Sequence, residues 1–214
     1  MTRERSFAAV LADRLYRCLN VIGIHGAVYY LVREDIDAEP PRDPRVDRGE
    51  FTVCFLGEDD MASIGRHPDR EQPWLTETAM RESLRKGNRC IGIKHNEEIA
   101  AFTWFNCGEI TYPPERRRLE ADEAYLFDLY TLKQYRGMGL APIVRAEAYR
   151  AIRAQGRTRV YSVSEFFNHA SIRVKKKLNA TFVHLGICVS LFNERYRWKW
   201  TLKTRACSQR PSRV

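Results

Sequence analysis

The segment that most constrains the fold runs from an apolar strand through a glycine turn into a helix. Residues 125–132 form a β-rich run, Gly137 and Gly139 follow, and apolar periodicity predicts a helix over 140–154. Glycines let the backbone approach a ligand without a Cβ in the way. The first N–H groups of a helix have no partner inside the helix and attract anions. The turn therefore suits a pyrophosphate, to which Arg136 adds a positive charge.

The pyrophosphate ligand is not fixed by the glycines alone. A P-loop is excluded, because the sequence lacks G-x-x-x-x-G-K-[ST]. A dinucleotide-binding turn is a rival, since Gly137 and Gly139 supply its first two glycines and Glu165 stands about where a ribose-binding acid would. Pro142 at the third glycine position argues against it, as do the four residues 133–136 between strand and glycine. An NAD(P)-binding oxidoreductase therefore stays as an alternative.

The remaining patterns mix strands with single helices, which is typical of the α/β class. Strands are expected over 51–56, 90–94, 99–107, 125–132, 159–164 and 182–192, and helices over 74–86, 140–154 and 170–178. A proline-rich connector precedes the first of these strands at 39–44.

The glycine block resembles the acyl-CoA motif of the GCN5-related N-acetyltransferases (GNATs), Q/R-x-x-G-x-G/A after a strand. Gln134, Arg136, Gly137 and Gly139 match this motif in order. A second block, which begins Asn168-His169-Ala170-Ser171, resembles the later motif of the family through its Asn and Ser. The spacing between the two blocks suits one helix and one strand, and two motifs in order are more specific than one glycine turn.

The resemblance covers roughly residues 51–192 and implies an α/β (α+β) fold. Its sheet would be mixed, mostly antiparallel, splayed at the acyl-CoA site and flanked by helices. Residues 1–50 are then an extra N-terminal helical arm with its connector, 51–192 the acyltransferase domain, and 193–214 a basic C-terminal strand or tail.

The resemblance also implies acetyl-CoA, or another acyl-CoA, as co-substrate, without a metal. Backbone amides of the turn would hold the CoA pyrophosphate, and the backbone of Leu129 and Thr131 would pair with pantetheine. The implied contact residues of the turn are Gln134, Tyr135, Arg136, Gly137, Met138, Gly139 and Leu140, with Asn168, Ser171 and Lys175 from the later motif.

The later motif departs from the family pattern at two positions. Lys175 stands where many members carry a tyrosine that protonates the leaving thiolate, so that role is not carried over, and we expect Lys175 to contact a CoA phosphate or to be a surface charge. Asn179 replaces the usual glycine, and Asn also accepts positive φ.

Acyl transfer to an amine needs a proton acceptor and a proton donor. Glu123, eleven residues before Gln134, matches the position of a glutamate base in several family members. Asp128 is the other candidate, because an acid inside a β-run beside a binding site is unusual and can have a shifted pKa. Tyr130 is a candidate donor, as are the hydroxyl groups of Tyr161, Ser162 and Ser164.

These residues predict an acyl-CoA-dependent N-acyltransferase, most simply an N-acetyltransferase, that transfers directly to a small-molecule amine, with an amino sugar as one candidate. A non-catalytic module of the same fold with a basic nucleic-acid-binding surface is a further alternative. It is motivated by the formal charge of +9 and by the runs 116–118 and 175–177, although nucleic acid is the less favoured partner. A homodimer is left open.

The N-terminal arm is expected to be helical over residues 5–31. Its apolar residues recur at three- and four-residue spacing: Val10, Leu11, Leu15, Cys18, Leu19 and Ile22. Packing of this stripe on its own domain is favoured over contact of the basic arm with a membrane surface.

The C-terminal region alternates aromatic and basic residues at Tyr196, Trp198 and Trp200, which favours an amphipathic edge strand over a base-stacking platform. The six cysteines include no C-x-x-C pair, and no apolar run approaches the roughly 20 residues of a membrane span. We therefore expect a reduced, cytoplasmic protein.

Overall fold

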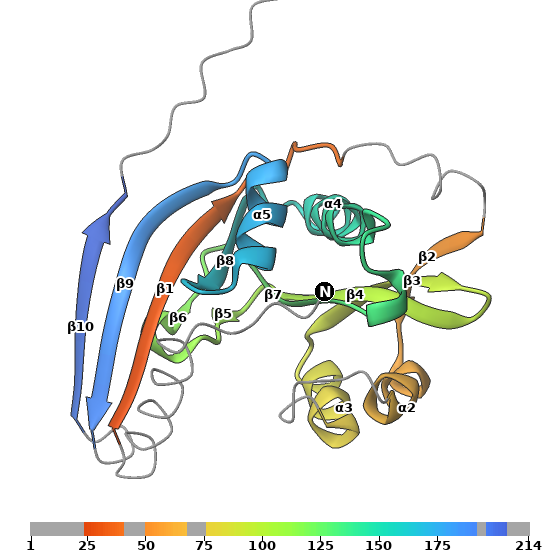
Figure 1. The fold of residues 1–214 in the computed structure, drawn as a ribbon, viewed down its shortest axis with the longest axis horizontal. Helices are drawn as coiled ribbons and strands as arrows, with labels where there is room; N and C mark the ends of the chain where they lie inside the picture. The colour runs from red at the N-terminus through yellow and green to blue at the C-terminus, as the bar shows by residue number, and fades with distance from the viewer. Residues whose placement is uncertain (1–23, 41–49, 68–75, 192–195, 205–214) are drawn as a thin grey trace, which may run out of the picture.

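The computed structural model describes residues 24–40, 50–67, 76–191 and 196–204. Its centre is an eight-stranded sheet in the order β10-β9-β1-β8-β7-β4-β3-β2 (Figure 1). The strands are β1 Ile24–Glu34, β2 Phe51–Leu56, β3 Arg89–His95, β4 Glu98–Asn106, β7 Glu123–Thr131, β8 Arg159–Glu165, β9 Thr181–Leu191 and β10 Tyr196–Lys203. A small second sheet pairs β5 Glu109–Ile110 with β6 Arg117–Arg118.

The helices are α2 Glu58–Arg66, α3 Glu77–Arg85, α4 Leu140–Arg153 and α5 His169–Lys177, with short 3₁₀ turns η1 Pro113–Glu115 and η2 Lys133–Tyr135. Figure 1 shows α4 on one face of β3 and β4, and α2 and α3 on the other. The predicted mixed α/β fold with a mostly antiparallel sheet is confirmed. No described helix is long and apolar enough to cross a membrane.

The parallel neighbours β7 and β8 stay together only over their first residues. Their pairing runs from Glu123 and Arg159 to Leu126 and Ser162. Beyond that point β7 pairs only with β4, and β8 pairs only with β1. The two strands therefore part as a wedge, which is the splayed sheet that the sequence predicted.

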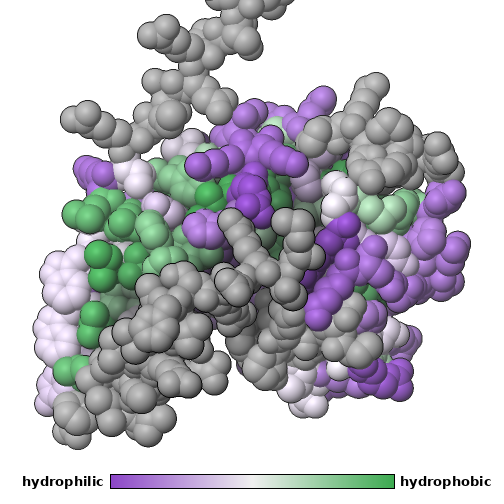
Figure 2. Space-filling view, in the orientation of Figure 1, coloured by the Kyte–Doolittle hydropathy of each residue, from purple (hydrophilic) through white to green (hydrophobic). Residues whose placement is uncertain are grey.

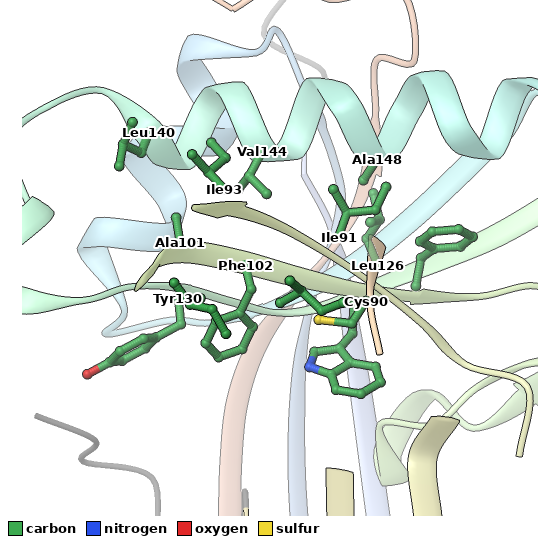
Figure 3. Packing of buried hydrophobic residues seen from close by; sticks show 14 of the residues in the cluster. Cys90, Ile91, Ile93, Ala101, Phe102, Leu126, Tyr130, Leu140, Val144 and Ala148 are labelled. Carbon is green, nitrogen blue, oxygen red and sulfur yellow. The ribbon is translucent and has the colours of Figure 1, made fainter. Parts of the chain in front are cut away.

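The core forms because α4 presents one apolar stripe to the sheet. Leu140, Val144 and Ala148, spaced by four residues, are all buried. In Figure 3 they point toward Ile91, Ile93 and Ala101 of the sheet, while Phe102 and Tyr130 lie on the opposite side of the strands. This packing fixes the start of α4 against the end of β7.

Helix α2 was not predicted from the sequence. It begins after Gly57 with the acidic residues Glu58, Asp59 and Asp60, a favourable N-terminal composition. Only Met61 and Ile64 of this helix are buried, so it shows too little apolar periodicity to be recognised.

The expectation of a helix that continues through residues 24–31 is wrong, because this stretch is the first part of β1. β1 lies between β8 and β9, and Tyr29, Leu31 and Val32 are buried. A strand covered on both faces has a continuous apolar run that periodicity alone does not separate from a buried helix. Residues 5–23, the rest of the predicted arm, lie outside the described residues.

Two smaller predictions are confirmed. β10 is an edge strand of the sheet, and Asn179 adopts φ of 53°, the left-handed conformation that the usual glycine would supply. With β1 and β10 included, the sheet extends beyond the range 51–192 at both ends.

Candidate active site

The backbone groups along the wedge can be assigned from strand alternation. Leu132 donates its N–H to Ala100 O on β4, so the N–H and C=O of Thr131, and by alternation those of Leu129, point away from β4 toward β8. On the other side, Phe166 donates to Val28 O on β1, so the carbonyl of Val163 points toward β7. The wedge is therefore lined by strand backbone from both sides.

The glycine turn lies at the end of β7 and opens α4. Gly137 and Gly139 have φ of 83° and 74°, which only glycine adopts without strain. Gly139 is the N-cap and provides no side-chain cap, so the N–H groups of Leu140 and Ala141 have no partner inside the helix. A Cβ at Gly137 would meet nothing within 4 Å, so the turn is open to a ligand. Pro142 fits at the third helical position, because that N–H is not needed by the helix.

The side chains of the turn hold the turn itself. Gln134 Nε2 and the Tyr135 hydroxyl donate to the Glu98 carboxylate at 2.9 and 2.8 Å. Arg136 Nε donates to Thr131 O at 3.1 Å, and its guanidinium lies 5.6 Å from the ring centroid of Tyr130. Met138 is half-buried against the core, and Leu140 is buried.

Asp128 lies just past the last β7–β8 pair, in a β-bulge. The register between β4 and β7 shifts between Phe102 and Trp104, and Asp128 has φ of 46°. No described residue forms a hydrogen bond or ion pair with its carboxyl group, and burial raises the pKa of Asp128 to about 6. A non-glycine residue at positive φ with an unpaired, half-buried acid is a feature to expect at a reactive site.

Glu123 has the opposite surroundings at the first pair of the β7–β8 ladder. Burial alone would raise its pKa, but hydrogen bonds from Arg117 and from the backbone N–H of Glu120, with Arg159 at 3.4 Å, lower it. Glu123 is buried, so it is not the exposed carboxylate of a loop end. Its oxygens are occupied, which does not fit a proton acceptor for a substrate.

The later motif forms the start of α5. Asn168 is its N-cap, and the side-chain oxygen accepts the N–H of Ser171 at 3.0 Å. The hydroxyl of Ser171 lies 2.8 Å from that of Ser164 on β8. These contacts explain the motif structurally, because they fix α5 to the strand that borders the wedge.

Lys175 is buried, so of its two expected roles, a CoA phosphate contact or a surface charge, the surface charge is wrong. Its Nζ donates to Val163 O at 3.0 Å, the carbonyl that points into the wedge. Burial lowers the pKa of Lys175 to about 7, although Glu34 at 4.0 Å favours the charged form. The helical spacing of α5 turns this residue inward and leaves Lys176 and Lys177 exposed.

The buried partner of Lys175 was missed from the sequence. Glu34 at the end of β1 accepts hydrogen bonds from Arg145 NH2 at 2.6 Å, from the Tyr149 hydroxyl at 2.7 Å and from Ser162. Burial raises its pKa, but Arg145 and the other donors lower it to about 2. The charged Arg145 beside the apolar stripe of α4 was the one sequence feature that indicated a buried ion pair. Its partner could not be identified from the sequence, because Glu34 is more than a hundred residues away.

The model of the acetyltransferase (GNAT) family matches residues 55–179, more than half of the chain. The chain belongs to the GNAT family. The predicted membership is thus confirmed, and the match spans both the glycine turn and the start of α5. A search of curated proteins found no match.

Solved structures agree with the GNAT fold. A Drosophila protein superposes with a TM-score of 0.58 at 16% identity, covering 86% of this chain and 58% of its own. A putative GNAT acetyltransferase from Novosphingobium aromaticivorans has a TM-score of 0.53 at 21% identity, covering 75% of this chain and 63% of its own. The chain thus spans less than two thirds of either relative, and at these identities the likeness shows the fold.

No group of three or more His, Cys, Asp or Glu residues that could hold a metal ion is found in the described part of the chain.

Proposed function

We propose that this protein is an acyl-CoA-dependent N-acyltransferase, and specifically an N-acetyltransferase acting on a small-molecule amine. The observation that carries this proposal is the open glycine turn at 137–139. It lies directly beside the wedge, into which β7 directs the backbone N–H and C=O groups of Leu129 and Thr131. Membership in the GNAT acetyltransferase family supports it.

The turn and wedge fit the two polar parts of an acyl-CoA. The unpaired N–H groups at the start of α4 suit its pyrophosphate, with the favourable end of the helix dipole behind them. The backbone of Leu129 and Thr131 suits the amides of pantetheine, which would extend β7 as a paired strand. Because Arg136 already donates to Thr131 O, we expect this side chain to move when the ligand binds.

Acyl-CoA supplies an activated thioester, and the chain must handle the protons. Asp128 is the proposed base, because no described residue pairs with its carboxylate and its pKa of about 6 leaves it deprotonated but basic at neutral pH. Glu123 is the weaker candidate, since Arg117 and Arg159 occupy its oxygens. Tyr130, next to the turn, is the proposed donor to the leaving thiolate, and its hydroxyl lies 3.4 Å from Arg136 NH2.

The alternatives have less support. A dinucleotide-binding oxidoreductase of the doubly wound type needs a mostly parallel sheet, whereas the only parallel pair in the described sheet is β7–β8. A nucleic-acid surface would use the basic runs 116–118 and 175–177, but Arg117 is engaged with Glu123 and Lys175 is buried.

Isothermal titration with acetyl-CoA tests the ligand and its site together. Gly137→Trp should weaken acetyl-CoA binding by tenfold or more, roughly 1.4 kcal/mol. Gly156→Trp is the matched control, because Gly156 also has positive φ and open space but follows the far end of α4. Equal binding by both variants, or binding of NAD(P) but not acetyl-CoA by the wild type, would contradict the proposal.

The acceptor is best found by a thiol-release screen. Acetyl-CoA and longer acyl-CoAs are each combined with amino sugars, other small amines and peptides. We expect turnover with a small amine, and release of thiol only with peptide acceptors would contradict that part of the proposal.

A further inference from the structure

One face of the sheet at β10 and β9 carries large apolar side chains in contact with solvent. Trp198, Trp200 and Leu202 are 46%, 53% and 58% exposed. They alternate along β10 and are paired with Val189, Ile187 and Leu185 of β9, so all six residues share one face. Exposed aromatic and aliphatic side chains gathered in this way mark an interaction surface.

The apolar face continues onto β1 and reaches the start of α5. Tyr30 on β1 pairs with Leu185, and its ring contacts those of Phe166 and Phe182. Next to Phe166, Phe167 is 76% exposed. The surface thus runs from the sheet edge to the α5 turn.

Helix α5 adds positive charge at the border of this face. It is fixed on the same side of the sheet, because Ser171 contacts Ser164, which pairs with Tyr30. Its exposed cations are Arg173, Lys176 and Lys177. In Figure 2 the hydrophobic area over β9 and the pale aromatic residues at the edge adjoin the hydrophilic area over α5.

Two cations of β10 itself, Arg197 and Lys199, lie on the other face and are engaged there. Lys199 Nζ lies 2.8 Å from Glu115, and Arg197 NH1 donates to Pro113 O at 3.2 Å. A single-stranded nucleic acid needs cations along the stacked aromatics to hold its phosphates. Here the cations stand at one border, and the formal charge of +9 opposes contact with a second copy.

We propose that the face formed by β10 and β9, with the cationic side of α5 at its border, binds the surface of an anionic lipid membrane. Trp and Tyr favour the membrane–water boundary, where the ring is buried and its polar edge is hydrated. Lys and Arg near such a face are attracted to anionic headgroups.

Sedimentation of the full chain with lipid vesicles tests the proposal. Phosphatidylcholine vesicles that contain phosphatidylglycerol should bind the protein at least tenfold more tightly than vesicles of phosphatidylcholine alone, and added salt should weaken this binding.

Two pairs of matched variants separate the apolar and the charged contributions. Trp198→Thr with Trp200→Thr should weaken vesicle binding by about tenfold or more. Phe55→Thr, at an equally exposed position on the opposite edge strand β2, should leave it unchanged. Lys176→Glu with Lys177→Glu should abolish the preference for anionic vesicles, whereas Arg85→Glu with Lys86→Glu at the C-terminal end of α3 should not.

Four outcomes would overturn the proposal. The wild type fails to bind either vesicle, or the tryptophan and α5 variants bind as the wild type does. A third outcome is that the wild type is a dimer that binds no vesicles and that the tryptophan variant is a monomer. A fourth is that the wild type binds single-stranded RNA through these tryptophans instead of vesicles. Acrylamide quenching gives an independent readout: tryptophans 198 and 200 should be accessible without vesicles and protected with them. Protection without lipid would mean that the chain itself covers this face, and it would overturn the proposal as well.

Discussion

Two acids of the central sheet, Glu34 on β1 and Asp128 on β7, lie in opposite electrostatic surroundings. Glu34 is fully buried, but Arg145, Tyr149 and Ser162 donate to it and its pKa falls to about 2. Asp128 is less buried, yet no described residue pairs with its carboxyl group and its pKa rises to about 6. The partners, rather than the depth of burial, decide which acid is fixed in the ionised form and which can exchange a proton at neutral pH.

The contrast also separates structural from reactive positions around the wedge. The ion pairs of Glu34 with Arg145 and with Lys175 connect β1 to α4 and to α5. Asp128 lies in the bulge of β7, where the backbone leaves regular pairing. The Glu34 carboxylate accepts its hydrogen bonds from side chains of the protein and therefore has a structural role. No described residue donates to the Asp128 carboxylate, which can therefore exchange a proton with a substrate.

The largest expected effect is on activity when Asp128 is replaced. Asp128→Asn should lower kcat/KM by roughly 10²- to 10⁴-fold, because general base catalysis is lost, without loss of stability at pH 7 to 8. In the wild type, kcat/KM should fall as the pH drops through about 6, where the base becomes protonated. Steady-state thiol release against pH measures both, and an unaltered rate in the variant would assign the proton transfer elsewhere.

The next largest effect is on folding when Glu34 loses its main partner. Arg145→Met should reduce the free energy of unfolding by about 3 to 5 kcal/mol, because a buried carboxylate is left without its charge partner. Urea denaturation measures this. The double variant with Glu34→Gln should recover part of the loss, and a loss as large as in the single variant would argue against the pairing.

Glu123→Gln tests whether Glu123 has a structural role, like Glu34, and not a catalytic role, like Asp128. Removal of its charge from the contacts with Arg117 and Arg159 should cost about 1 to 3 kcal/mol of stability. The rate of acyl transfer should change by only a few-fold, which the thiol-release assay measures on folded protein. A rate loss as large as that of Asp128→Asn would make Glu123 the base.

The smallest effect is the pH dependence of stability that Asp128 contributes. Its pKa rises from 3.8 to about 6 on folding, so the folded state disfavours the ionised form. The neutral Asp128 carboxyl therefore stabilises the fold fully below about pH 4, and this contribution is lost as the pH rises through 6. The resulting loss in the free energy of unfolding is at most about 3 kcal/mol, because each pKa unit corresponds to about 1.36 kcal/mol. Thermal unfolding of Asp128→Asn should lack this component, and identical pH curves for both proteins would contradict the shift.

The sequence predicted what depends on local chemistry. The strand, turn and helix from Leu126 to Ala141 follow from neighbouring residues, and the strand β2 was predicted with its observed bounds. An acid inside a strand marked Asp128 as unusual. The bulge that isolates it was out of reach, since it depends on the register between β4 and β7.

Features that depend on distant residues were not predicted. β1 was assigned to a helix because its apolar run has no visible alternation, and only β8 and β9 on its two sides make it a central strand. Lys175 was expected to contact a CoA phosphate or to be a surface charge, and its burial was not predicted. Its partner Glu34 lies far away in the sequence, so the buried ion pair follows from the tertiary fold alone.

The contrast between the paired and the unpaired acid is tested most directly by carbon NMR titration of the side-chain carboxyl groups, assigned with Asp128→Asn and Glu34→Gln. The Asp128 carboxyl should titrate near pH 6, while that of Glu34 should remain ionised down to about pH 2 or until the protein unfolds. An Asp128 midpoint near 4, the ordinary value for this side chain, would contradict the assignment of Asp128 as the base in the β7 bulge.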